Sequence, residues 1–167
     1  MGDLYTDFKV HDQLEPRVWV DGDMRPEVKK RLLKIAEEFL DSMDADVSWE
    51  DVILVGSMAN FNYSRFSDID VHIIVDFEEI NDDKGFVEEF MDAKKVIWND
   101  EHQIMVRGHE VEMYVQDVDE VVESSGVYSI LNGKWIKEPD PSKPDFDLSL
   151  VRKKAQWMMD LVDDAME

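Results

Sequence analysis

Two aspartates separated by a single residue stand within an apolar stretch of the sequence. Asp68 and Asp70 alternate with Ile69 and Val71, and this period of two predicts a β-strand over residues 68–75. In such a strand both carboxylates project from one face while the apolar side chains enter a core. Two carboxylates this close repel each other, and Mg²⁺, which binds one or two carboxylates together with substrate phosphates, removes that cost. The alternative is a solvated strand face in an acidic protein.

A glycine–serine pair lies upstream of these aspartates. Gly56 and Ser57 close the apolar run of residues 51–55, which predicts a short buried strand. Residues 58–66 predict a helical turn followed by a loop. Glycine lets the backbone approach a ligand closely, and the free N–H groups of a following helical turn favour phosphate. Taken alone, the pattern is more often a purely structural turn.

A third carboxylate belongs to a later strand. Glu112 stands between Val111 and Met113, and the apolar residues on both sides indicate a strand with one buried face. Glu110 shares the face of Glu112, so either glutamate could be the third acid. The larger apolar neighbours favour Glu112, and an exposed strand glutamate is the alternative.

Polar residues in the loop between Ser57 and the aspartates could contact a phosphate or a sugar. Arg65 is the basic residue nearest to the aspartates, although an ordinary surface arginine is as good an interpretation. Asn60, Asn62 and Ser64 either hydrogen-bond a ligand or satisfy the loop itself. His72 lies on the face of the aspartates, and we expect it to be a hydrogen-bonded structural histidine.

The elements that must position these residues alternate between helix and strand. Apolar residues at helical spacing predict helices, and short apolar runs that flank turn residues such as Asn132-Gly133 predict hairpins. The expected elements are an N-terminal arm over 1–25, helices over 26–43, 82–98 and 145–167, strands over 51–55 and 68–75, and hairpins that join 104–106 to 111–115 and 127–131 to 134–137. We therefore expect one α/β (α+β) domain over residues 1–167. Its mixed β-sheet is flanked by helices, with the C-terminal helix packed on it.

Composition excludes several classes of protein. The chain has 167 residues, with 18 basic and 40 acidic side chains, a net charge of −22 and 44% hydrophobic residues. The charge argues against binding of a long nucleic-acid template, which requires lysine and arginine. The absence of cysteine excludes disulfides and thiolate chemistry. No apolar run is long enough for a membrane span, and without a signal-peptide pattern we expect a cytoplasmic protein.

Together, the glycine–serine pair, the two aspartates and the later glutamate resemble the signature of the nucleotidyltransferase superfamily that includes DNA polymerase beta. The resemblance rests on Leu54-Val-Gly-Ser57, ten intervening residues, Asp68-Ile-Asp-Val71 and the later Val111-Glu-Met113. The chain looks closest to small stand-alone nucleotidyltransferases of tailed phages, which would place it in the host cytoplasm. That closer resemblance is carried by Trp19, 31–36, 56–62, 67–72, 98–100, 110–117, 126–129 and 134–136.

The resemblance implies a nucleotidyltransferase-like fold and a reaction. Such an enzyme transfers a nucleoside monophosphate from a nucleoside triphosphate (NTP), for example ATP, to an acceptor hydroxyl and releases pyrophosphate. Asp68, Asp70 and Glu112 would be the catalytic residues and would hold two Mg²⁺ ions, or Mn²⁺, with Glu112 as the general base. The residues implied for nucleotide binding are Gly56, Ser57, Asn60, Arg65 and Ser67.

The acceptor and the activity itself leave alternatives open. Residues 110–123 hold six acids and no lysine or arginine, so we expect the acceptor to be a protein, a small molecule or a nucleic-acid end. One alternative is a nucleotide-binding module that has lost catalysis. The other is an acidic interaction protein without enzymatic activity. Neither the preferred NTP nor the oligomeric state is readable from the sequence.

Overall fold

The structure is a computed structural model that describes residues 10–43 and 47–142, together with Gln156 and Met159. Its centre is a six-stranded sheet with the strand order β5-β6-β4-β3-β7-β8. The strands are β3 (Asp51–Val55), β4 (Ile69–Val75), β5 (Met105–Val106), β6 (His109–Asp117), β7 (Val127–Ser129) and β8 (Lys134–Lys137). Strands β4 and β6 are parallel and the other pairs are antiparallel, which confirms the predicted mixed sheet.

Strand β4 shows the predicted alternation. Ile69, Val71, Ile73 and Val75 are buried, whereas the residues between them are partly exposed. Strand β3 is more uniformly apolar and lies between β4 and β7, as expected for a strand that is covered on both faces. The period of two therefore places Asp70 and His72 on the face opposite to the main core.

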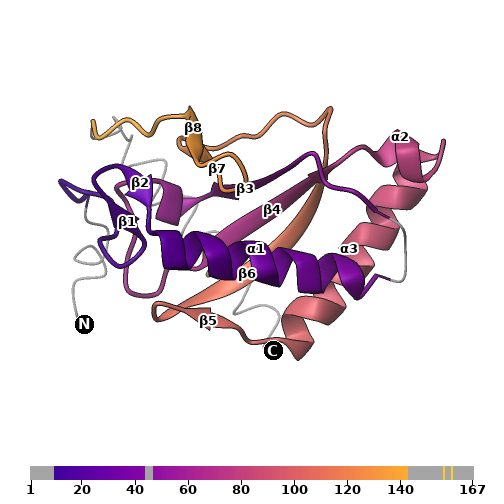
Figure 1. Ribbon diagram of the computed structural model, residues 1–167, viewed down its shortest axis with the longest axis horizontal. Coiled ribbons are helices and arrows are strands. Elements are labelled where there is room, and N and C mark those ends of the chain that lie inside the picture. Colours follow the sequence, from indigo (N-terminus) through magenta and orange to yellow (C-terminus); the bar gives the residue numbers. More distant parts are fainter. Residues whose placement is uncertain (1–9, 44–46, 143–155, 157–158, 160–167) are drawn as a thin grey trace.

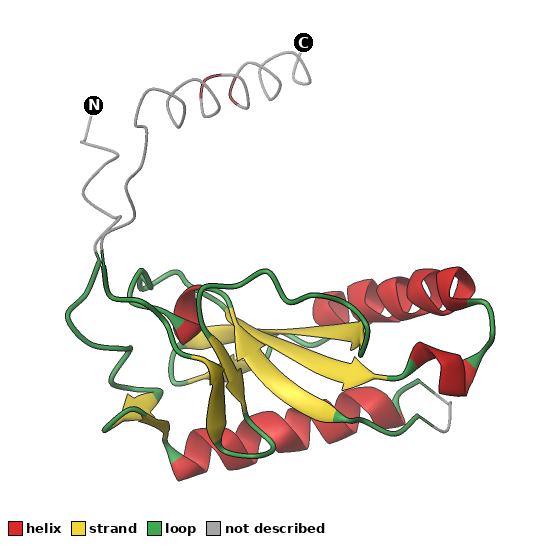
Figure 2. Ribbon diagram, turned by 90° about the horizontal axis from the view of Figure 1, so that it is seen from above, coloured by secondary structure: helices red, strands yellow, loops and turns green. Residues whose placement is uncertain are grey.

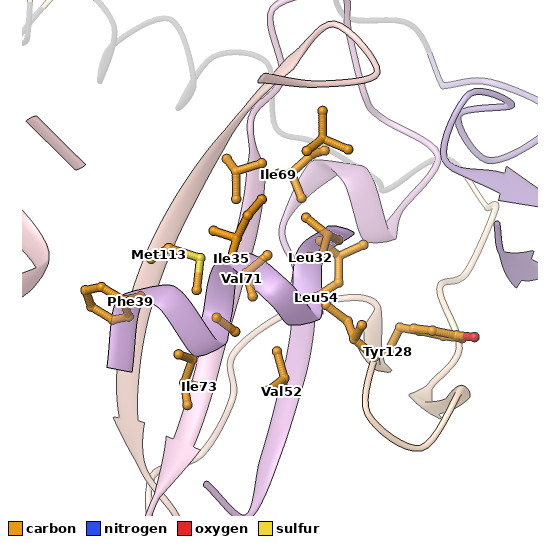
Figure 3. Close-up of a cluster of buried hydrophobic side chains, with 14 of the residues drawn as sticks. Leu32, Ile35, Phe39, Val52, Leu54, Ile69, Val71, Ile73, Met113 and Tyr128 are labelled. Carbon is orange, nitrogen blue, oxygen red and sulfur yellow. The ribbon is translucent and has the colours of Figure 1, made fainter. Parts of the chain in front are cut away.

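Two long helices flank the sheet (Figure 2). Helix α1 (Pro26–Asp41) begins with proline in its first turn, where the missing N–H costs nothing, and α3 (Lys84–Glu101) begins at the N-cap Asp83. Figure 3 shows the α1 side chains Leu32, Ile35 and Phe39 packed over the apolar face of the central strands. The predicted helices over 26–43 and 82–98 are confirmed. The short helix α2 (Phe77–Ile80), which Asp76 caps, was not predicted.

Helix α3 also contacts the outer edge of β6. The Asn99 side chain donates to the Met113 carbonyl (3.1 Å) and accepts from the Met113 backbone N–H (3.0 Å). Both hydrogen bonds imitate those of a neighbouring strand, because an amide side chain carries one donor group and one acceptor. Asn99 thereby ties α3 to the strand that bears Glu112.

Both predicted hairpins are present, and a third ribbon was missed. In the β5–β6 turn, Arg107 and Gly108 have positive φ. Gly133, in the turn between β7 and β8, also has a positive φ. The missed ribbon joins β1 (Trp19–Val20) to β2 (Asp23–Met24). Its turn is Asp21-Gly22, again with both residues at positive φ, so this dipeptide was an available hairpin signal.

The described part of the N-terminal segment is joined to the sheet through aromatic residues. Trp19 is 3% exposed, donates from Nε1 to the Met58 carbonyl (2.8 Å) and contacts Tyr128 and Trp135. The predicted helix over 145–167 falls outside the described residues, apart from Gln156 and Met159, as do residues 1–9 of the predicted arm. Within the described residues, no helix has the length and apolar character to cross a membrane.

Candidate active site

Asp70 and Glu112 face each other from adjacent parallel strands. They are register partners in the β4–β6 pair, and on its other side Asp70 is the register partner of Val55 in β3. Val55 directly precedes Gly56, and Asp68 directly precedes β4. The sheet therefore brings together three features that lie far apart in the sequence: the glycine–serine pair, the two aspartates and Glu112.

The backbone at Gly56 requires glycine. Its φ is +71°, and a Cβ at this position would overlap Oδ2 of Asp70, so the Asp70 carboxylate lies directly against the glycine. The Gly56 N–H donates to Ser124 Oγ (3.3 Å) from the loop before β7. The 3₁₀ turn η1 (Ser57–Ala59) follows, which confirms the predicted helical turn.

Burial and neighbouring negative charge disfavour ionisation of the two aspartates. Burial raises the pKa of Asp70 to about 6, and the negative charges of Glu112 and then Asp68 add to the effect. Burial and the charge of Glu112 also raise the pKa of Asp68. Glu112 is thus the glutamate that influences both aspartates, whereas Glu110 pairs with Met105 in the β5–β6 hairpin.

Glu112 is held by a neighbour on its own strand. The Tyr114 hydroxyl donates to Glu112 Oε2 (2.5 Å). The pKa of Tyr114 is raised by burial and by this hydrogen bond, so the phenol keeps its proton and remains a donor. The Tyr114 ring stacks on His72 at 4.8 Å between centroids, with Lys95 Nζ 5.1 Å from the ring centroid.

His72 has the structural role that the sequence suggested. Its Nδ1 donates to Gln116 Oε1 (2.9 Å), and burial lowers its pKa, so the ring is neutral near pH 7. It reaches the acids only through its stacking contact with Tyr114.

The donor set fits Mg²⁺ in its chemistry. Carboxylate oxygens are the ligands that Mg²⁺ prefers, and a divalent cation would relieve the repulsion that raises the pKa of both aspartates. In their present rotamers the side chains do not converge, because Asp70 lies against Gly56 and Glu112 is turned to Tyr114. Accordingly, the described residues contain no group of three or more histidine or acidic side chains that could hold a metal ion as they stand.

Three other residues expected to bind nucleotide contact neighbouring protein groups. Asn60 donates from Nδ2 to Ser125 Oγ (2.7 Å), and Ser67 Oγ accepts from the Ser64 N–H (2.9 Å). The Arg65 guanidinium lies 4.3 Å from the centroid of the Phe66 ring. Both Arg65 and Phe66 are exposed, and Arg65 makes no hydrogen bond or ion pair with any other described residue.

Sequence reasoning missed two residues that contact the site. Tyr114 lies two residues after Glu112 on a strand, so the period of two already placed it on the same face. Ser124, by contrast, reaches Gly56 across 68 positions of sequence, and no local pattern marks it.

Comparison with protein families agrees with this geometry. The family model described as "Nucleotidyltransferase domain" matches residues 30–128, which is more than half of the chain and spans the glycine–serine pair and all three acids. The chain therefore belongs to the nucleotidyltransferase domain family, within the polymerase beta-like superfamily. Searches among curated proteins and solved structures gave no match.

Proposed function

We propose that this protein is a Mg²⁺-dependent nucleotidyltransferase that transfers a nucleoside monophosphate from an NTP to an acceptor hydroxyl with release of pyrophosphate. Family membership supports nucleotidyl transfer in general. The observation that carries the proposal is the register of Asp70 with Glu112 beside Gly56. This register puts the three acids at one place on the sheet, next to the backbone of Gly56.

Asp68, Asp70 and Glu112 would hold the metal ions. Bound Mg²⁺, or Mn²⁺ in its place, would neutralise negative charge on the triphosphate and make the acceptor hydroxyl more acidic. Glu112 accepts the proton of that hydroxyl as the general base. One of its oxygens, Oε2, accepts from the Tyr114 hydroxyl.

The nucleotide would lie along the turn that follows β3. Because Gly56 has no Cβ, the Asp70 carboxylate can lie against the backbone of this turn, and the Ser57 hydroxyl can donate to a phosphate beside it. Asn60, Arg65 and Ser67 follow in the adjoining loop, where Arg65 is free to swing because it makes no polar bond to the described residues. We take ATP as the first donor to test.

The acceptor would be a protein, a small molecule or a nucleic-acid end. The acidic stretch 110–123, which includes Glu112, disfavours a long template strand. A phosphate-bearing small molecule needs only a local cationic site.

A thermal-shift experiment tests the metal–nucleotide site. The melting temperature is measured with each of the four NTPs, with and without Mg²⁺, for the wild type, Asp70→Asn and the control Asp100→Asn on the exposed surface of α3. A ligand at 100 times its Kd adds about 2.7 kcal/mol of stability. We expect one NTP to stabilise the wild type and the control only with Mg²⁺, and Asp70→Asn not at all. Equal stabilisation of all three proteins would refute the site. If the site is supported, the NTP that stabilises the wild type becomes the donor in a search for the acceptor, which is recognised by release of pyrophosphate.

A further inference from the structure

Three arginines line an open pocket of about 460 Å³, together with Pro16. Arg17 precedes the β1–β2 ribbon, Arg25 is the N-cap of α1, and Arg107 forms the β5–β6 turn. Figure 1 shows the ribbon, the start of α1 and this turn at the same end of the molecule. Such a group of cations is unexpected in a chain with a net charge of −22.

The guanidinium groups are held in position by bonds that leave other donors open. Arg17 donates from Nε to the buried Glu15 (2.8 Å), and Arg25 donates from Nε to the Pro16 carbonyl (2.8 Å). An arginine has five N–H donors, and neither terminal nitrogen of Arg25 is hydrogen-bonded within the described part of the chain. The pocket thus presents oriented N–H groups before any ligand arrives.

The charge of the pocket is positive after its own carboxylates are counted. Glu15 pairs with Arg17 and Glu27 pairs with Arg107 (2.6 Å), so two of the three positive charges are offset and Arg25 remains. Planar guanidinium groups bind phosphate through paired N–H donors. A phosphate monoester therefore matches both the charge and the donor geometry of the pocket.

A chain of contacts joins this pocket to the acids. Arg17 Nη2 donates to His109 Nε2 (2.7 Å), so His109 carries its proton on Nδ1 and donates it to the Ser67 carbonyl (2.6 Å). Ser67 directly precedes Asp68. His109 lies three residues before Glu112 on β6, roughly 10 Å along the strand, and the odd separation puts their side chains on opposite faces of the sheet. A substrate that reaches from the pocket to the acids must therefore pass around the end of β4, beside Ser67 and Asp68.

We propose that the pocket of Arg17, Arg25 and Arg107 binds a phosphate group of a substrate while the reacting part of that substrate lies at the acids. The placement in the reaction rests on the proposed nucleotidyl transfer, whereas the phosphate site itself does not. The phosphate belongs either to the acceptor or to the triphosphate of the NTP. Both sources present the same oxyanion to the arginines.

Binding without metal tests the pocket directly. Calorimetric titration with ribose 5-phosphate and with inorganic phosphate in EDTA compares the wild type, the double variant Arg25→Gln/Arg107→Gln and the control Arg31→Gln, which removes an exposed arginine of α1 outside the pocket. We expect the Kd of the double variant to rise at least 10-fold and that of the control to stay unchanged. Absence of binding to the wild type, or equal Kd values for all three proteins, would overturn the proposal.

A conservative variant covers the case in which the double variant does not fold. Arg25→Lys keeps the positive charge but removes the paired N–H donors. Circular dichroism confirms that it is folded, and we expect a Kd between those of the wild type and the double variant. An unchanged Kd in folded Arg25→Lys, together with an unchanged Kd in folded Arg25→Gln, contradicts the pocket.

A second arm identifies the source of the phosphate and separates this proposal from the proposed function. Loss of Mg²⁺–ATP affinity in Arg25→Gln assigns the pocket to the triphosphate, and loss of ribose 5-phosphate affinity alone assigns it to the acceptor. Asp70→Asn should bind ribose 5-phosphate in EDTA like the wild type. If Mg²⁺–NTP fails to bind the wild type while monoester binding still depends on Arg25, the proposed function fails and the pocket stands. If Mg²⁺–NTP binding depends on Asp70 while the arginines have no effect on any ligand, the pocket fails alone.

Discussion

The hydroxyl of Tyr114 donates a 2.5 Å hydrogen bond to Glu112, the glutamate in register with Asp70. Both residues lie on β6 and on one face of the sheet, since they are two positions apart. The bond occupies one oxygen of Glu112, so a metal ion at this site must compete with a tyrosine for the carboxylate.

Removal of that tyrosine hydroxyl should strengthen metal binding. A hydrogen bond to a charged group contributes about 1.5–3 kcal/mol, and part of it is lost when Glu112 turns to a cation. We expect Tyr114→Phe to lower the Kd for Mn²⁺ in the presence of ATP by about 3- to 10-fold, a change of about 0.7–1.4 kcal/mol. Titration followed by electron paramagnetic resonance of free Mn²⁺ measures this. A weaker affinity in Tyr114→Phe would mean that the tyrosine supports the ligand geometry instead.

Asp70 should destabilise the protein when no metal is present. Its pKa is raised from 3.8 to about 6 in the folded state, so between these values the folded state holds a proton that the unfolded chain has released. The free energy of unfolding therefore falls as the pH rises through this window and stays lower above it. Because Asp70 is only partly buried, we expect Asp70→Asn to stabilise the protein at pH 8 by about 1–2 kcal/mol in EDTA.

Urea unfolding at pH 4 and pH 8 in EDTA measures this effect. The difference between Asp70→Asn and the wild type should appear at pH 8 and shrink at pH 4, whereas the exposed control Asp100→Asn should change little at either pH. A destabilised Asp70→Asn at pH 8 would contradict the repulsion among the three acids.

Gly56→Ala should impair both stability and nucleotide binding. The φ of +71° disfavours alanine, and its Cβ would overlap the Asp70 carboxylate, so the aspartate must move. We expect a loss of about 2–4 kcal/mol and at least a 10-fold weaker binding of Mg²⁺–ATP. Thermal unfolding and calorimetry report the two effects.

Gly22→Ala is the matched control for this substitution. Gly22 has a φ of +87°, but a Cβ there would meet nothing within 4 Å. The Gly22→Ala variant has the backbone strain of Gly56→Ala but displaces no carboxylate. We therefore expect it to lose some stability and to keep its affinity for the nucleotide. Equal nucleotide affinity in both variants would show that the contact between Gly56 and Asp70 is not needed for binding.

Asn99→Ala should weaken the strand that carries Glu112. It removes two hydrogen bonds and leaves the Met113 N–H and carbonyl without their partner. We expect a loss of about 1–3 kcal/mol and faster hydrogen exchange of the Met113 amide by nuclear magnetic resonance. Asn62→Ala, on the exposed loop surface, is the control and should leave that exchange rate unchanged.

Local patterns in the sequence were sufficient for most of the central sheet. The alternation around Asp68 and Asp70 predicted β4 because the period of two follows directly from burial of one face. The same reasoning gave α1, α3 and both hairpins. It failed at α2, whose four residues are too few for a helical period, and at the β1–β2 ribbon, whose strands have only two residues each.

The candidate site depended on information that no local pattern contains. Sequence order and the family resemblance brought Gly56, Asp70 and Glu112 into one hypothesis. The register of β6 on β4 is set by tertiary packing, as is the approach of Ser124 to Gly56. The orientation of Glu112 toward Tyr114 is a rotamer choice between two partners, and sequence alone does not decide it.

The side chain of Asn99 has a consequence for how molecules of this protein meet one another. An unpaired strand edge is a template on which a second chain can add a strand, and proteins that leave it open are prone to aggregate. At Met113 that template is already occupied by an amide from α3. At the opposite edge, β8 carries the exposed lysines Lys134 and Lys137, whose charges repel a like strand. Growth of the sheet is thus hindered at two places, by an imitation strand at Met113 and by charge along β8.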